Sequence, residues 1–150
     1  MTTEDLIVTA DIIEALETLM YGAVGMTAVA LSAASAGELT LSQWRALVVI
    51  GRSDATRVGV IGASVGMSLP SASRLVRRLE RRGLVSTERD EGDRRATLVR
   101  MTLAGRALRD DVVERRRALM EDALATHSPR LPGGLLPGLA AIGDAFGEYA

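Results

Sequence analysis

The sequence predicts a mainly α-helical fold that carries a small β-hairpin. Apolar residues recur every three or four positions over most of the chain, as they do on one face of a helix. Residues 68–83 are an arginine-rich, amphipathic example that ends at a glycine. Two alternating segments, 84–89 and 97–101, then flank the polar loop 90–96. A helix followed by such a hairpin predicts a winged helix-turn-helix with additional helices before and after it.

The N-terminal segment, residues 4–36, is expected to form a long helix. Apolar positions from Leu6 to Met20 recur at helical spacing, and acids in the first turn suit the positive end of the helix dipole. After Tyr21 the segment becomes rich in Gly, Ala and Ser, so we expect a bend or an early end.

Two further helices are expected before the arginine-rich segment. The first runs from Thr40 or Ser42, either of which can cap it, to about Gly51. Residues 52–57 are expected to be a polar connection. The next segment, VGVIGASVG at 58–66, contains three glycines and three valines. Its position makes it the first helix of the helix-turn-helix.

The segment 68–83 is expected to be the recognition helix. Ser68 should cap it, Pro70 lies in its first turn, and Gly83 should end it. Its core face carries Ala72, Leu75, Val76 and Leu79. The remaining positions carry Ser71, Ser73, Arg74, Arg77, Arg78 and Arg81.

The C-terminal part is expected to be two helices. One begins near Thr102, and residues 128–134, with two prolines and two glycines, should interrupt the chain. The last helix carries an apolar seam at Leu135, Leu139, Ile142, Phe146 and Tyr149. These apolar surfaces exceed what one small domain can cover, so we expect a homodimer. The chain then divides into an N-terminal dimerisation helix (1–38), the winged domain (39–102) and C-terminal dimerisation helices (103–150).

Composition excludes several kinds of chemistry. The chain has no cysteine, which removes disulfides, thiolate metal sites and thiol redox switches. All 18 basic residues are arginine, so no Schiff-base or P-loop lysine exists. The acids at residues 88–93 are interleaved with arginines, which predicts a salt-bridged hairpin tip instead of a metal site. We expect no metal and no cofactor.

The N-terminus points to the cytoplasm. It carries acids where a secretory signal would carry bases, and we expect no apolar run long enough to span a bilayer. No membrane association is therefore expected.

The net charge of −1 hides a strong asymmetry. Residues 71–106 hold ten arginines and five acids, whereas the rest of the chain holds eight arginines and 14 acids. One basic segment in a near-neutral chain predicts a localised anionic partner. The alternative is a solvated helix face whose charges are paired with one another.

The recognition helix and the hairpin offer two places to hold double-stranded DNA. Residues near the N-terminus of a helix in the major groove lie deepest, which selects Ser71, Ser73 and Arg74. Arg74, with Arg77 or Arg78, is a candidate for base-edge or phosphate contacts. The alternative is that these arginines only make an exposed helix soluble.

The hairpin tip carries two adjacent arginines, Arg94 and Arg95, which loop stability does not require. Either could enter the minor groove, where the potential is negative, and physical arguments alone do not rank them. Asp93 is expected to brace an arginine or the tip backbone, because a carboxylate facing phosphate would be repelled.

Several motifs resemble those of the MarR family of bacterial transcription regulators, in the same order. Residues 41–47 resemble the family's entry to its second helix, and 71–85 resemble its recognition helix and the following turn. Arg89, the run 93–95, and then Leu103 with Gly105 match the wing and the helix that follows. Arg77 departs from the pattern, since many members carry an acid there.

The resemblance implies a triangular homodimer that acts as a repressor and whose two winged domains grip a pseudo-palindrome. It implies that Arg95 is the first choice for the minor groove. It further implies DNA contacts from a set of eight residues: Ser71, Ser73, Arg74, Arg77, Arg78, Arg89, Arg94 and Arg95. The absence of cysteine excludes the thiol-oxidation switch of some members.

A small-molecule effector is a further implication of the resemblance. The family often binds an aromatic or anionic ligand between the dimer helices and the winged domain. Four residues are candidates to line such a cleft: Met20, Tyr21, Met26 and Trp44. The alternative is ordinary core packing, which is commoner for Met and Trp at helical spacing.

A serine hydrolase is the competing interpretation. Residues 62–66 fit G-x-S-x-G, and Asp110 or Asp111 and then His127 follow in the order that such enzymes use. The chain is too short for the usual hydrolase sheet and lacks alternating strands and helices. A helical segment at 58–66 would exclude the motif, so we expect no catalysis; His127 should cap the end of a helix.

Overall fold

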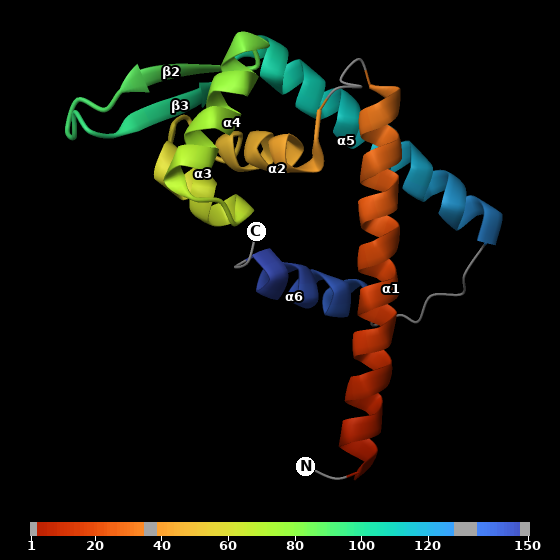
Figure 1. The fold of residues 1–150 in the computed structure, drawn as a ribbon. Coiled ribbons are helices and arrows are strands. Elements are labelled where there is room, and N and C mark those ends of the chain that lie inside the picture. Colours follow the sequence, from red (N-terminus) through yellow and green to blue (C-terminus); the bar gives the residue numbers. More distant parts are fainter. Residues whose placement is uncertain (1–2, 35–38, 128–134, 148–150) are drawn as a thin grey trace.

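The computed structural model describes residues 3–34, 39–127 and 135–147. This part of the chain forms six helices and a three-stranded sheet (Figure 1). The elements in chain order are α1 (Thr3–Ala33), α2 (Leu41–Ile50), β1 (Thr56–Arg57), α3 (Val58–Val65), α4 (Leu69–Arg81), β2 (Val85–Arg89), β3 (Thr97–Met101), α5 (Leu103–His127) and α6 (Leu135–Gly147). The predicted mainly helical, winged helix-turn-helix fold is confirmed.

One apolar core joins α2, α3, α4 and the sheet. Leu47, Ile50, Ile61, Leu79 and Val99 are completely or almost completely buried there. The four positions predicted for the core face of α4 are all buried: Ala72, Leu75, Val76 and Leu79. The core therefore fixes which face of α4 points outward.

The sheet is antiparallel, with strand order β1-β3-β2. β2 and β3 are the predicted hairpin, in register from Val85 opposite Met101 to Arg89 opposite Thr97. β1 was not predicted, since residues 52–57 were expected to be only a connection. Its two residues pair with Val99 and Leu98, and so short a strand shows no alternation in the sequence.

The ends of the helices explain their boundaries. Thr40 closes a capping box with Gln43 at the start of α2, so it is the cap of this helix. Ser68 has the backbone conformation of an N-cap, but its hydroxyl makes no capping bond and instead donates to Ser71 Oγ at 3.2 Å. The predicted position of Ser68 as the N-cap residue is therefore confirmed, and only the side-chain capping bond is missing. Gly83, at φ 70°, ends α4 as predicted, because its left-handed backbone lets Leu84 N donate to the Leu79 carbonyl.

α1 is continuous over 31 residues and runs through Gly22 and Gly25 to Ala33, so these glycines do not end it. It extends well beyond the winged domain (Figure 1). Its segment Ala10–Ala33 has a mean hydropathy of 1.3 and is long and apolar enough to cross a membrane. By these measures the expectation that no such run exists is wrong. Core helices of soluble proteins pass the same test, so length and composition do not assign this helix to a bilayer.

The C-terminal helices leave the wing from Thr102. Its Oγ1 accepts a hydrogen bond from Gly105 N at 3.1 Å and donates one to the Gly83 carbonyl at 2.6 Å, which ties the start of α5 to the end of α4. The predicted interruption at 128–134, Tyr149 and the side chain of Phe146 lie outside the described residues.

Candidate nucleic-acid interface

The outward face of α4 forms a cationic groove. The groove has a volume of about 500 Å³ and is lined by Pro70, Ser73, Arg74, Arg77, Arg78 and Arg81. Glu80, the single acid of α4, faces the other way and accepts hydrogen bonds from Thr87 N (3.1 Å) and Thr87 Oγ1 (2.6 Å). The groove therefore carries arginine charge with no carboxylate from its own helix.

Hydrogen bonds within α4 orient this face. Arg74 Nη2 donates to Ser71 Oγ at 3.1 Å, and Arg77 Nε donates to the Ser73 carbonyl at 3.4 Å. Ser73 Oγ donates to the Leu69 carbonyl at 2.9 Å. These contacts leave most guanidinium N–H groups free to donate elsewhere, because an arginine has five.

The charges of this face are not neutralised within the described part of the chain. The ion pairs of the described residues involve none of the arginines of α4. They are formed by Arg57, Arg100, Arg109, Arg115 and Arg117. The wing arginines Arg89, Arg94 and Arg95 also make no ion pair with a described carboxylate. An anionic ligand would thus meet these groups without first breaking an internal salt bridge.

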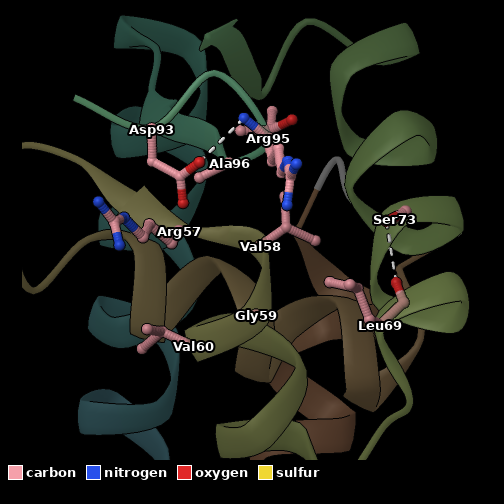
Figure 2. Close-up of a pocket in the computed structure, with 10 residues that line it drawn as sticks. Arg57, Val58, Gly59, Val60, Leu69, Ser73, Asp93, Arg95 and Ala96 are labelled. Atoms are coloured by element: carbon pink, nitrogen blue, oxygen red, sulfur yellow. Dashed lines mark hydrogen bonds between the residues drawn. The ribbon is translucent and has the colours of Figure 1, made fainter. Parts of the chain in front are cut away.

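A second hollow, of about 470 Å³, lies between α3, α4 and the wing. Figure 2 shows Asp93 and Arg95 on the wing loop above it, with Val60 and Leu69 from the two helices below. Ser73 lines this hollow and the groove along α4 alike. The two hollows are therefore neighbours on one surface, and Arg95 lies on the same surface as Arg74 and Arg77.

The wing loop is held by its aspartates. Asp93 Oδ1 accepts a hydrogen bond from Arg95 N at 3.1 Å, so Asp93 braces the tip backbone as predicted. Asp90 Oδ1 accepts from Gly92 N at 2.9 Å, and Asp90 Oδ2 accepts from Arg57 Nε at 2.9 Å. The Gly92 N–H first, and then the Arg57 guanidinium, hold the pKa of Asp90 below its ordinary value.

The predicted DNA-contacting residues fall into three groups. Ser73, Arg74, Arg77 and Arg78 line the groove along α4. Ser71 is half-buried on the flank of α4 that faces α2, in a hollow of about 310 Å³ that Arg74 and Arg78 also line. On the wing, Arg95 faces α4, whereas Arg89 and Arg94 are exposed but line neither of the hollows that contain Ser73.

Sequence reasoning missed two parts of this surface. Arg81 was placed on the outer face of α4 but not among the DNA-contacting residues, although its spacing of four from Arg77 continues the same row. Arg57 was treated as part of a connection, and it links β1 to the wing through Asp90. The long sequence separation of that pair hides it from any local pattern.

The four candidate effector residues do not meet in one cleft. Met20 and Tyr21 line a shallow hollow of about 370 Å³ on α1, together with Glu17 and Val24. Tyr21 is 80% exposed. Met26 is half-buried, and Trp44 belongs to the core of the winged domain at 4% exposure.

The structure excludes the hydrolase geometry. Ser64 lies inside helix α3, and its carbonyl accepts a hydrogen bond from Arg45 Nη2 at 2.9 Å. A nucleophile elbow requires a turn between a strand and a helix, which is absent at this helical segment. His127 is the last residue of α5, and its Nδ1 lies 2.9 Å from the Ala123 carbonyl, as expected of a residue that caps the helix end.

The fold and this cationic surface define a winged helix-turn-helix protein of the DNA-binding class. Residues 38–96 match the model of the MarR family. This match covers 59 of the 150 residues, from just before α2 into the wing, and shows a likeness to that family over this segment.

Several solved structures are similar in fold over most of the chain. RV1404 from Mycobacterium tuberculosis is 24% identical, with a TM-score of 0.80 over 98% of this chain and 96% of that chain. A MarR-family transcriptional regulator from Rhodococcus sp. RHA1 is 24% identical, with a TM-score of 0.67 over 89% and 90%. FabT of Streptococcus pneumoniae, solved in complex with DNA, is 18% identical, with a TM-score of 0.70 over 93% of both chains. At these identities the structures show a shared fold.

A curated sequence is also similar. The uncharacterized HTH-type transcriptional regulator YfiV of Bacillus subtilis (strain 168) is 24% identical over 109 residues, which are 73% of this chain and 68% of that protein.

Proposed function

We propose that this protein is a homodimeric repressor that binds a pseudo-palindromic operator through α4 and the wing. The observation that carries this proposal is the continuity of the cationic surface. Ser73 borders both the arginine groove and the hollow beneath Arg95. One duplex can therefore contact helix and wing together, with α4 in the major groove and Arg95 in an adjacent minor groove.

Phosphate contacts would supply most of the affinity. Arg77, Arg78 and Arg81 follow one another along α4 with no ion pair to a described carboxylate, and a row of cations suits a polyanionic backbone. Arg89 and Arg94 extend the positive surface along the wing. FabT, whose fold is similar, has been solved in complex with DNA, which supports DNA as the ligand here.

The flanking helices would make the dimer. The apolar segment of α1 includes exposed Ile13, Leu19, Val24 and Val29, and a second copy of this chain would cover them. A bilayer is the less favourable occupant, because Asp11, Glu14 and Glu17 lie on the same helix and a carboxylate at the bilayer centre costs roughly 2.5–3.5 kcal/mol. In this proposal residues 1–38 and 103–150 dimerise, residues 39–102 bind DNA, and the protein works in the cytoplasm.

A small aromatic or anionic effector is part of the proposal. Met20 and Tyr21 border a hollow on α1, the helix assigned to the dimer. A ligand there would release DNA if it bound more tightly to a dimer whose recognition helices are wrongly spaced. Trp44 would act only indirectly, since it is buried in the winged domain.

The proposal is tested by selecting bound fragments from a pool of random duplexes at one stated salt concentration. We expect two inverted half-sites whose centres lie about 10–10.5 base pairs apart, which matches two recognition helices about 34 Å apart. An enriched site without two-fold symmetry would contradict the homodimer, and no enrichment would contradict sequence-specific binding.

Self-association is tested separately by deleting residues 135–150. Sedimentation of the full chain should report a dimer, and the shortened chain should dissociate at higher concentration, because it loses an apolar seam. Equal dissociation constants for the two chains would remove α6 from the proposed interface.

A further inference from the structure

Leu69 is an apolar side chain in an unexpected place. It is the first residue of α4 and is 59% exposed, although the surface around it is polar and cationic. Its carbonyl accepts the Ser73 hydroxyl, and Arg77 lies one turn further along the same face. Leu69 therefore stands at the leading end of the row of side chains that faces away from the core.

A second exposed apolar side chain faces the same hollow. Val60, from α3, is 52% exposed and lines the hollow together with Leu69 and Arg95. Figure 2 shows the two side chains on opposite sides of Gly59, below the wing loop. Single exposed apolar residues are common, but two that border one hollow on a binding face need an apolar group to contact.

Leu69 is not required by the fold. Met67, two residues earlier, packs against the core, whereas Leu69 is not part of it. The turn into α4 is set by the extended backbone of Ser68 and by Pro70, and neither depends on the leucine side chain. The side chain is therefore free to serve recognition.

We propose that Leu69, with Val60 across the same hollow, contacts the C5-methyl group of a thymine in the major groove and so determines part of the operator sequence. This inference rests on the proposed function. The occupant should be anionic, because Arg95 lines the same hollow and Arg74 and Arg77 line the neighbouring groove, and none of the three forms an ion pair with a described carboxylate. Asp93 also lines the hollow, where its Oδ1 accepts a hydrogen bond from Arg95 N. The occupant must also present a methyl group at the depth that the first turn of a recognition helix reaches. The thymine methyl is the apolar group that the major groove displays.

The inference is tested with a duplex obtained by selection and with copies in which uracil replaces each thymine in turn. Uracil keeps every hydrogen-bonding group and lacks only the methyl. For the full-length protein we expect uracil at one position of each half-site to weaken binding by about fourfold, the value for one buried methyl group. Fluorescence anisotropy at fixed salt measures the affinity.

Three variants locate the contact. Leu69→Ala should bind the thymine and uracil duplexes equally, whereas Leu69→Met, which keeps an apolar side chain, should retain the preference for thymine. Leu103→Ala is the matched control, since Leu103 is also the first residue of its helix and is 83% exposed. It should discriminate as the wild type does. Thermal unfolding of each variant shows that the fold is kept.

The possible results separate the role of Leu69 from the proposed function. Equal affinity of the wild type for all thymine and uracil duplexes, or full discrimination by Leu69→Ala, would overturn the role of Leu69 while leaving operator binding intact. A selected site with no thymine would do the same. Absence of any sequence-specific binding would overturn the proposed function and this inference together.

Discussion

At the scale of single residues, Arg74 combines two hollows of the surface with a hydrogen bond that orients its side chain. It borders both the groove along α4 and the hollow between α4 and α2, and its Nη2 is oriented by Ser71 Oγ at 3.1 Å. An arginine held in this way near the start of a recognition helix loses less side-chain freedom on binding than a free one. It is therefore the strongest candidate for a base-edge contact.

We expect Arg74→Ala to weaken operator binding by about 1–3 kcal/mol and to relax the preference at one base pair of each half-site. Titration against the selected duplex and its single-base variants measures both effects. Arg117→Ala, which removes an equal charge from an exposed ion pair on α5, is the control and should bind normally. If Arg74→Ala lost affinity equally on all sequences, Arg74 would contact phosphate and not a base.

Asp90 gives the wing a dependence on pH. Its pKa lies below the ordinary value of 3.8, because the Gly92 N–H and the Arg57 guanidinium favour the carboxylate. The stabilisation is therefore fully present above that ordinary value and is lost as the pH falls through the lower pKa of the folded state.

We expect Asp90→Asn to lower the free energy of unfolding at pH 6, and the difference from wild type to shrink below about pH 3.8. Urea unfolding followed at several pH values measures this difference. A difference that stays constant from pH 6 to pH 3 would show that the charge of Asp90 contributes nothing.

At the scale of elements, α4 and the hairpin could be predicted from the sequence, but β1 and the packing of α3 could not. The core face of α4 repeats every three or four residues, so local order alone reveals it. β1 depends on Val99, which lies more than 40 residues away. In α3, a Cβ on Gly62 would lie 3.0 Å from the Met67 carbonyl and 3.1 Å from Ala72 Cβ. That glycine allows α3 and α4 to approach, which no pattern within α3 indicates.

Separation along the sequence also decides which parts of the cationic surface could be predicted. The arginine row of α4 was predictable because its residues are close in sequence, whereas the hollow beneath Arg95 is assembled from three separate elements. The candidate effector residues were grouped by residue type and by the cleft that the family resemblance implies, and the structure separates Trp44 from Met20 and Tyr21. Spacing along one helix therefore predicted contacts better than residue type did.

The start of α5 must lie close to the end of α4, and Gly105 makes this possible. An added Cβ there would clash with the Leu84 carbonyl oxygen. We expect Gly105→Ala to destabilise the fold by about 2–3 kcal/mol, because the two backbones must separate. Gly59→Ala, where no atom lies within 4 Å, should be neutral or stabilising by up to about 1 kcal/mol. The midpoint of urea unfolding measures both effects. A midpoint of Gly105→Ala equal to that of the wild type would refute the close approach of the two backbones.

The wing is expected to contribute through Arg95. We expect Arg95→Ala to weaken binding most where the bases flanking each half-site are A·T-rich, since a narrow minor groove concentrates negative potential. Competition between duplexes that differ only in their flanks measures this preference. Arg94→Ala is the matched control at the neighbouring position; a larger loss there than at Arg95 would reverse their roles.

At the scale of the whole molecule, the charge is divided between two regions. The winged domain carries the positive surface, while most acids lie outside residues 71–106. Such a separation attracts a polyanion to one face and leaves the apolar faces of the flanking helices for association. The small net charge of the chain therefore conceals a strongly cationic binding face.

The central claim is that the arginines of α4 and those of the wing contact one DNA duplex at the same time, at its backbone and at its bases. The most direct test is the salt dependence of operator affinity for the wild type and for the Arg77→Ala/Arg89→Ala double variant, which removes one proposed phosphate contact from α4 and one from the wing. Each lost phosphate contact should reduce the slope of log K against log salt by about 0.9. We predict a shallower slope and lower affinity for the double variant at every salt concentration. An identical slope and affinity would contradict the claim.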